Sequence, residues 1–309
     1  MTLPGPSAGT PPDCAGTTEP VLSVVVATVN AERTIDRCLA AWHRATAHIL
    51  TDIVVVDAST DRTIDRVAAF PGVRAIAVAP GALVPALWAR GLESSRSRFV
   101  AFAIGQCEVT APWGDRMMAA MTPAVGGAGG AFALRSGSRP SVAGWFFLRY
   151  SNYLEGRWTA GPVAGEIAGD NALYRRSDLS AAGTPADGFW EIEVHRRLRR
   201  AGLTLVAVDG GTTVVIDAPA PGRVLRERFV HGRHFGAYRA TSGAMRLRLI
   251  AAAPLVPALL VARIARRVWP AAGYRPAFVR ALPWLCLFAA AWALGEAAGA
   301  CRQAAVRTA

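Results

Sequence analysis

Residues 22–29 read LSVVVATV, an apolar run about as long as one β-strand. A second run, IVVV at residues 53–56, leads into the polar phrase DASTDRT. Uninterrupted apolar runs bounded by turn residues are typical of strands buried on both faces, as in the centre of a parallel sheet. These two runs therefore predict the core of an α/β fold.

Helical spacing alternates with strand-like runs along the first half of the chain. Apolar residues recur at helical spacing in residues 35–42, 64–67 and 82–94. Residues 74–79 and 99–103 predict a third and a fourth strand. Strands that alternate with helices imply right-handed crossovers and a mostly parallel sheet flanked by helices.

Polar residues follow three of these strands, where α/β folds bind ligands at the carboxyl ends. They occupy residues 28–30, 57–61 and 104–108. Asp57 would accept a hydrogen bond from a uracil-type imide N–H or a ribose hydroxyl, with Thr28 and Asn30 in the same pocket. Turn and cap roles explain these residues as well, with Asn30 capping the first helix and Asp61 the second.

The second half of the chain begins after a glycine-rich stretch at residues 126–140, which we expect to separate the two halves. Its recognisable parts are an aromatic segment (145–153), the phrase AGDNALYRRSDL (168–179), a helix-like segment (188–202), two strand-like runs (203–210 and 212–216) and a basic stretch (223–239). Two apolar segments follow the basic stretch. The length of 309 residues suits one large α/β domain with a smaller appendage.

All of the net charge lies at the C-terminal end of the chain. From residue 223 onward there are fourteen arginines and two acids, which accounts for the whole excess of +12. These arginines alternate with the most apolar segments, a pattern more typical of a cytoplasmic membrane surface with anionic lipids than of a nucleic-acid interface. A solvated basic tail is the alternative.

Five scattered cysteines without CxxC spacing indicate neither a disulfide framework nor a zinc site, and so favour a reducing compartment. Residues 1–20 lack the basic start and apolar centre of a signal peptide. Their proline, glycine and threonine content predicts a disordered leader.

Several phrases together resemble one enzyme family. SVVVATVNAERTI (23–35) and IVVVDASTDRT (53–63) resemble the opening of the family 2 glycosyltransferases, whose fold is called GT-A. GDNALYRR (169–176) and the segment 188–202 are similar to that family's acceptor-side region. The HGR segment (231–233) and the phrase WALGEAAG (292–299) resemble a membrane-associated branch. The resemblance runs from about residue 22 to the C-terminus.

This resemblance implies a GT-A domain on the cytoplasmic side of the inner (cytoplasmic) membrane. It would transfer a sugar, with inversion, from a nucleotide-diphosphate donor to a lipid-linked or polysaccharide acceptor in cell-envelope biosynthesis. The expected parts are a leader (1–20), the GT-A domain (21–222), a basic interface segment (223–245) and a membrane-associated helical tail (246–309). A degenerate relative that only binds a lipid or a partner is the alternative. A nucleotidyltransferase is disfavoured because residues 28–33 are not a glycine-rich phosphate loop.

The resemblance places Glu191 where the family keeps its catalytic base. Sugar transfer needs a carboxylate near the acceptor hydroxyl, because the attacking oxygen loses its proton as the bond forms. Glu193 is the second candidate, and His195, one turn after Glu191, would orient or shield it. A salt-bridged amphipathic helix explains the same residues without catalysis. The family's usual glutamate before this position is replaced by Trp190.

Further substrate contacts are expected on the acceptor side and in the basic stretch. Asp170 and Asn171 have polar ends suited to sugar hydroxyls, although turn roles explain them as well. The resemblance places His231, Arg233 and Arg239 near the donor diphosphate, where arginine pairs well with phosphate oxygens. Contact with lipid headgroups is the alternative. The segment lacks the Gln-x-x-Arg-Trp phrase of relatives that polymerise sugars, which disfavours processive synthesis.

The family usually ends its fourth strand in Asp-x-Asp, whose carboxylates hold a divalent metal. Here VAFAIGQCEVTAPW (100–113) places Ile104 and Gln106 at these positions. Isoleucine offers no ligand to Mg²⁺ or Mn²⁺, and the neutral amide of Gln106 substitutes poorly for a carboxylate. Glu108 is the nearest acid and a weak candidate ligand. We therefore expect a metal-independent or weakly metal-dependent enzyme, with Gln106 contacting substrate and the arginines of residues 223–239 neutralising the diphosphate. A divalent cation, Mg²⁺ or Mn²⁺, is the alternative.

The apolar tail predicts membrane contact. Residues 281–301 are long enough to span a bilayer, whereas residues 249–262 are short and contain two prolines, which suits a re-entrant or interfacial segment. Five arginines lie between them, and the positive-inside rule keeps that connection cytoplasmic. Only the second segment is then expected to cross, although the resemblance suggests a pair of transmembrane helices.

Overall fold

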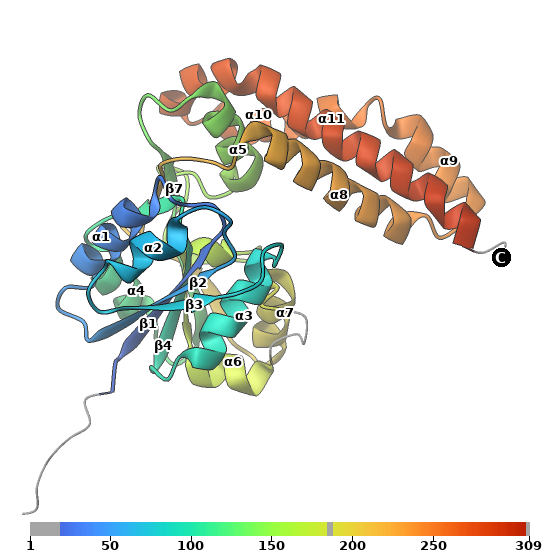
Figure 1. The fold of residues 1–309 in the computed structure, drawn as a ribbon. Helices are drawn as coiled ribbons and strands as arrows, with labels where there is room; N and C mark the ends of the chain where they lie inside the picture. The colour runs from blue at the N-terminus through green and yellow to red at the C-terminus, as the bar shows by residue number, and fades with distance from the viewer. Residues whose placement is uncertain (1–18, 184–187, 307–309) are drawn as a thin grey trace, which may run out of the picture.

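The computed structural model describes residues 19–183 and 188–306, with side chains described as far as residue 301. An eight-stranded sheet has the order β3-β2-β1-β4-β9-β6-β10-β8 and carries helices on both faces. A group of long helices extends to one side of it (Figure 1). This confirms the α/β fold with a helical C-terminal part. Residues 1–18 of the expected leader lie outside the described residues.

The first half of the chain forms four adjacent parallel strands, as predicted. The strands are β1 (Leu22–Thr28), β2 (Thr51–Asp57), β3 (Val73–Ala77) and β4 (Phe99–Ile104). The connecting helices are α1 (Ile35–Ala45), α2 (Thr63–Ala68) and α3 (Val84–Ser94). The carboxyl ends of β1, β2 and β4 therefore meet at one edge of the sheet.

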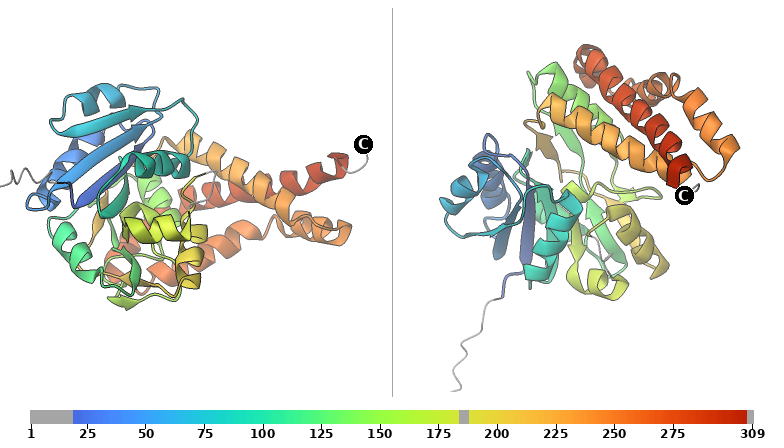
Figure 2. Two further views of the ribbon diagram at one scale, coloured as in Figure 1. Left: turned by 90° about the horizontal axis from the view of Figure 1, so that it is seen from below. Right: turned by 45° about the vertical axis from the view of Figure 1, so that its right-hand side comes forward.

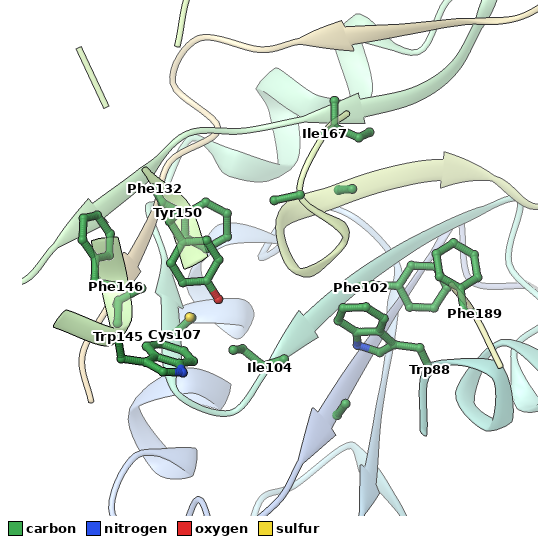
Figure 3. Packing of buried hydrophobic residues seen from close by; sticks show 14 of the residues in the cluster. Trp88, Phe102, Ile104, Cys107, Phe132, Trp145, Phe146, Tyr150, Ile167 and Phe189 are labelled. Carbon is green, nitrogen blue, oxygen red and sulfur yellow. The ribbon is translucent and has the colours of Figure 1, made fainter. Parts of the chain in front are cut away.

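Alternate residues of each strand supply two hydrophobic cores. Val24 and Val26 of β1 pack with Leu39 and Trp42 of α1 on one face. Val25 of β1 belongs to the opposite core, which includes the side chains shown in Figure 3. Helices α1, α2 and α4 (Trp113–Ala120) cover the first face, and α3, α6 (Arg176–Ala182) and α7 (Glu191–Arg200) cover the second (Figure 1). Burial on both faces explains why the strands read as continuous apolar runs.

The second half of the chain extends the same sheet with mixed strand directions. Its strands are β6 (Val125–Gly129), β8 (Gly161–Pro162), β9 (Ala172–Arg175) and β10 (Thr204–Ala207). Strand β9 lies antiparallel between β4 and β6, and so joins the two halves directly. A small second sheet has the order β5-β11-β7, from Cys107–Val109, Thr213–Val215 and Phe132–Leu134.

The glycine-rich stretch is not a spacer between the halves, and this expectation was wrong. Its first glycines form β6, a fully buried strand inside the sheet. A Cβ at Gly127 would lie 2.9 Å from the Tyr174 ring, and one at Gly129 would lie 2.5 Å from Ile167. Glycine is required here because large side chains of neighbouring elements fill the space over the strand.

Four helices follow the last strand, and we call them the arm. They are α8 (Pro221–Arg239), α9 (Gly243–Ala252), α10 (Val256–Val268) and α11 (Arg275–Val306). Helices α9 and α10 meet at an angle of 67°. The short apolar segment 249–262 is thus divided between two helices. One described helix, at residues 272–301, has the length and composition to cross a membrane, and the bent pair α9 and α10 passes the same test if it is taken as one broken span.

Helices α8 and α11 lie side by side in backbone contact through glycines (Figure 2). A Cβ at Gly236 of α8 would lie 2.0 Å from the carbonyl oxygen of Glu296. Conversely, a Cβ at Gly299 of α11 would lie 1.9 Å from the carbonyl oxygen of Arg233. Gly232 and Gly295 make equivalent close approaches. Each helix thus carries a Gly-xxx-Gly pair that receives the backbone of the other.

The first half of α11 belongs to the core of the α/β domain. Phe278, Leu285 and Phe288 are buried in one cluster with Phe146 and Phe147 of α5 (Pro140–Tyr150). A Cβ at Gly144 of α5 would lie 2.9 Å from Trp284, so glycine also allows this close approach. The arm is therefore packed firmly against the domain.

Candidate active site

A cleft opens where the carboxyl ends of β1, β2 and β4 face the start of α8. One hollow of about 440 Å³ lies over residues 58–60 and 80–83, and a second of about 280 Å³ lies between Gln106 and residues 217–221. Val29, Asn30 and Arg223 border both hollows. A third hollow of about 100 Å³ adjoins them between Ile104 and Arg149, and Val29 and Arg223 border it as well. We call the three together the strand-end cleft, and the third its inner part. The cleft lies where the sequence predicted a ligand site.

Asp57, the last residue of β2, is buried beside this cleft with one oxygen already engaged. Thr28 and Ser59 donate hydroxyl hydrogen bonds of 2.6 and 2.5 Å to its Oδ1. All the hydrogen bonds recorded for this carboxylate within the described residues fall on Oδ1. Oδ2 has no hydrogen-bond partner among the described residues, while Thr28 and Ser59 fix the orientation of the carboxylate.

Asn30 connects two strand ends and does not cap a helix. Its side-chain oxygen accepts a hydrogen bond of 2.8 Å from the backbone N–H of Thr60, and its φ of 55° is left-handed. Helix α1 begins only at Ile35, so the capping interpretation of Asn30 was wrong. Asp61 does act as a cap, since its Oδ1 accepts the N–H of Thr63, the first residue of α2. Asn30 therefore shapes the floor of the cleft.

Basic side chains form the wall of the strand-end cleft opposite the strands. The lining residues of this kind are Arg33, Arg139, Arg223, Arg226 and His231. Arg139 and Arg33 lie 2.8 and 3.6 Å from Asp217, and Arg223 bonds Glu227 at 2.7 Å. Two acids therefore offset only part of the charge, and the cleft suits a polyanion. Sequence reasoning missed Arg33 and Arg139, because nothing local links them to the strand ends.

Ile104 and Gln106, which stand where the family has Asp-x-Asp, line the inner part of the cleft. Gln106 lines it and donates to the carbonyl oxygen of Val29 at 3.4 Å, while Ile104 is buried in the aromatic cluster of Figure 3. Glu108 is paired with Arg37 of α1 at 2.5 Å, so it does not reach the cleft. The described residues hold no group of three His, Cys, Asp or Glu side chains arranged for a metal ion.

Asp170 lies at the centre of a buried polar cluster next to the inner part of the cleft. Its Oδ2 accepts hydrogen bonds from Tyr150 at 2.5 Å and from Arg149 at 2.9 Å. Arg149 also lines the cleft with Trp145, over whose ring its guanidinium lies at 5.9 Å. Arg149 therefore links the cleft to Asp170.

Glu191, the first residue of α7, belongs to this acidic neighbourhood. Its carboxyl carbon lies 3.3 Å from where a Cβ would stand on Gly169, so the glycine lets it approach the loop that carries Asp170. Burial raises the pKa of Glu191; Arg149 opposes this and the charge of Asp170 adds to it. A half-buried carboxylate with a raised pKa has the properties of a general base.

The other two predicted catalytic residues point elsewhere. Glu193 lies on the surface and pairs with Arg197 at 3.1 Å and with Arg196. His195 is fully buried, and its ring bonds the Tyr174 hydroxyl at 2.7 Å and the Glu166 carboxylate. No hydrogen bond between His195 and Glu191 is recorded in the described chain. The expected orienting contact is therefore absent, and His195 holds α7 to the sheet.

Asn171 is a structural residue in this geometry. Its side-chain oxygen accepts from the Trp113 indole at 2.7 Å, and its amide donates to the carbonyl oxygens of Ala131 and Gly211. The side chain is 1% exposed, which leaves no polar group for a sugar. Asp170 is the member of the predicted pair that lies next to the cleft.

The three predicted residues of α8 separate along the helix. His231 lines the strand-end cleft, and burial together with neighbouring Arg228 lowers its pKa. Arg239, about 12 Å further along the helix, bonds Glu296 at 2.7 Å and belongs to the arm. Arg233 lies where α8 meets Gly299, and it does not line the cleft either. Arg223 and Arg226 take the place expected for Arg233 and Arg239.

Comparisons with solved structures give distant likenesses. S. aureus TarS 1–349 in complex with UDP has a TM-score of 0.48 and 14% identity, covering 92% of this chain and 91% of that one. A second structure of TarS 1–349 has a TM-score of 0.48 and 12% identity, covering 93% and 91%. A mycobacterial protein has a TM-score of 0.47 and 20% identity, covering 69% and 73%. No family model and no curated protein matches the chain.

Proposed function

We propose that this protein is a glycosyltransferase that moves a sugar from a nucleotide-diphosphate donor to a lipid-linked or polysaccharide acceptor, with inversion, at the cytoplasmic face of the membrane. One observation carries the proposal. A buried carboxylate with a free oxygen, Asp57, lies beside a cleft whose opposite wall is basic. A nucleoside and a diphosphate are the two halves of a ligand that would satisfy both features. The phrases that resemble family 2 glycosyltransferases support the same assignment.

The nucleoside would occupy the larger hollow. There Asp57 Oδ2 accepts a hydrogen bond from an imide N–H or a ribose hydroxyl. The loop after β3 supplies Gly81 and Leu83 as an apolar surface for the base. The diphosphate then points toward α8, where Arg223 and Arg226 lie.

The leaving diphosphate gains negative charge as the glycosidic bond to it breaks. Arg223 borders both hollows and the inner part of the cleft, so it is placed to hold this charge with Arg226. Neutral His231 offers a hydrogen bond without repelling the arginines. This is a metal-free arrangement, in which fixed guanidinium groups act where many relatives use a divalent cation.

The acceptor hydroxyl would approach from the side of Asp170 and Glu191. In the proposal Glu191 takes the proton of that hydroxyl, while Asp170, held by Arg149 and Tyr150, binds a neighbouring hydroxyl. The raised pKa of Glu191 makes its carboxylate a stronger base than an exposed one. Screening hydrolysis of a panel of nucleotide sugars tests the proposal; absence of both binding and hydrolysis with every donor would contradict it.

Asp57→Ala is expected to weaken binding of the nucleoside diphosphate by about 10–100-fold, because a hydrogen bond to a charged group is lost. Isothermal titration with a set of nucleoside diphosphates measures the effect. Asp61→Ala is the matched control, since Asp61 caps α2 and should alter stability but not affinity. Equal affinity of Asp57→Ala and the unchanged protein would remove Asp57 from the site.

Activity is expected to persist in excess EDTA, within about twofold of its value in Mg²⁺ or Mn²⁺, because the cleft balances the diphosphate with arginines. Hydrolysis and transfer rates with and without chelator measure this. A full loss in EDTA that Mg²⁺ or Mn²⁺ restores would show that the metal-free proposal is wrong. Absence of activity in every condition, with donor binding also absent, would instead favour the degenerate relative.

A further inference from the structure

The arm carries most of the exposed apolar surface of the molecule. Of the sixteen large apolar side chains that are exposed in the described residues, eleven lie between Phe229 and Leu294. Leu255 and Leu259 at the start of α10 are each 64% exposed. Such a concentration of exposed apolar side chains marks an interaction surface.

Helix α11 contributes an apolar stripe to this surface. Its exposed large apolar residues Val279, Leu287 and Leu294 recur at intervals of two helical turns, over about 22 Å. The opposite side of the same helix carries Phe278, Leu285 and Phe288, which are buried. One side of α11 therefore packs inside the protein while the other faces outward.

The charge of the arm indicates what covers this surface. Its two acids are already paired, Glu227 with Arg223 and Glu296 with Arg239. The remaining arginines of α9, α10 and the start of α11 have no ion pair recorded in the described chain; they are Arg246, Arg248, Arg263, Arg266, Arg267, Arg275 and Arg280. Unpaired arginines around exposed leucines fit an anionic lipid surface.

Two contacts argue against α11 crossing a bilayer as a single spanning helix. To span, residues 281–301 would withdraw Leu285 and Phe288 from the core that they share with α5. The far half of α11 is in backbone contact with α8, which would carry Arg233 and Arg239 into the hydrocarbon. Length and composition suit spanning, but these packing partners do not.

We propose that the arm attaches the protein to one face of an anionic bilayer without crossing it. Helices α9 and α10, bent by 67°, lie in the interface with their leucines toward the acyl chains and their arginines among the headgroups. Helix α11 stays inside the protein as the support of the arm. The proposal deepens the membrane setting of the proposed function, and its tests do not depend on sugar transfer.

Accessibility of the two ends of α11 decides the topology. Gly273→Cys places a thiol at an open position before α11, and Cys301 supplies an exposed one near its end. Cys14 and Cys286 are replaced by serine, while Cys38 and Cys107 are buried and stay. Sealed membrane vesicles of both orientations are treated with an impermeant maleimide. If both ends of α11 lie on one face of the bilayer, the two thiols are labelled together in one vesicle orientation and are both protected in the other. Labelling of one thiol in each orientation would overturn the proposal.

Vesicle flotation of the full chain tests the surface. Strong binding is expected to vesicles of 70% phosphatidylcholine and 30% phosphatidylglycerol, with at least tenfold weaker binding to pure phosphatidylcholine. Leu255→Ser with Leu259→Ser should reduce binding at least tenfold. Leu50→Ser, at a position that is 50% exposed on the α/β domain, is the matched control and should change nothing. Failure of the unchanged protein to bind anionic vesicles, or self-association through these leucines instead, would overturn the proposal.

Discussion

Glu191→Gln is expected to lower turnover by about 10²–10⁴-fold and to leave affinity for the nucleotide-sugar donor nearly unchanged. The substitution keeps the shape of the side chain but removes its ability to take a proton. The acceptor oxygen would then attack without losing its proton to the protein. Single-turnover transfer rates, with donor affinity from titration, separate the two effects.

The control for this substitution lies on the same helix. Glu193→Gln removes a carboxylate that pairs with surface arginines, and we expect turnover to change by less than about threefold. Unchanged turnover in Glu191→Gln would remove Glu191 from the mechanism. A large loss in Glu193→Gln would instead contradict the placement of Glu193 outside the site.

The pH dependence offers an independent signature of the same base. Glu191 must be ionised to act, and burial raises its pKa above the ordinary value of a glutamate. Activity should therefore fall as pH decreases through this raised pKa, at a higher pH than an exposed glutamate would give. The acidic limb of the rate profile should disappear in Glu191→Gln. The same raised pKa means that the protonated form favours the folded state, so this contribution to stability is lost as pH rises.

Arg223→Gln is expected to lower turnover by about 10²–10³-fold, because one fixed group that stabilises the leaving diphosphate is removed. The loss should be larger in turnover than in donor affinity, since charge builds up mainly in the transition state. Steady-state kinetics in detergent measure both. Arg266→Gln, an exposed arginine of α10, is the matched control and should behave as the unchanged protein. Equal kinetics in both variants would place the diphosphate elsewhere.

The first half of the fold could be predicted from the sequence because its three central strands, β1, β2 and β4, are largely buried on both faces and read as continuous apolar runs. Strand β9 was not recognised, since its residues read as part of an acceptor-side phrase and the strand is only four residues long. Strand β6 was taken for a spacer because glycines carry no pattern of alternation. The glycines of this strand are required by the side chains of Tyr174 and Ile167, which pack over it but are distant in the sequence.

The sequence predicted the candidate site only for residues whose place directly after a strand brings them to the edge of the sheet. Asp57 and Asn30 follow strands, and strand ends meet in any parallel sheet. Asn171 was assigned to substrate because it is polar, and His195 was expected to orient or shield Glu191 because it follows one helical turn later. Trp113 satisfies Asn171 inside the core, and Tyr174 and Glu166 satisfy His195. Arg139 lies just before α5, far from the strand ends in the sequence, so its place in the cleft could not be predicted. Polar residues reveal their role only when their partners are known.

Packing of α11 against α5 has a practical consequence for work on the isolated enzyme. A shortened chain that ends at residue 222 would seem the natural way to obtain a soluble catalytic fragment. Such a chain would leave Phe146 and Phe147 without the cover of Phe278 and Phe288. Each aromatic side chain uncovered forfeits about 1.5–3 kcal/mol of burial, on the scale of a small domain's whole stability. Solubility is better sought by replacing the outward leucines of α10, with the full helix α11 retained.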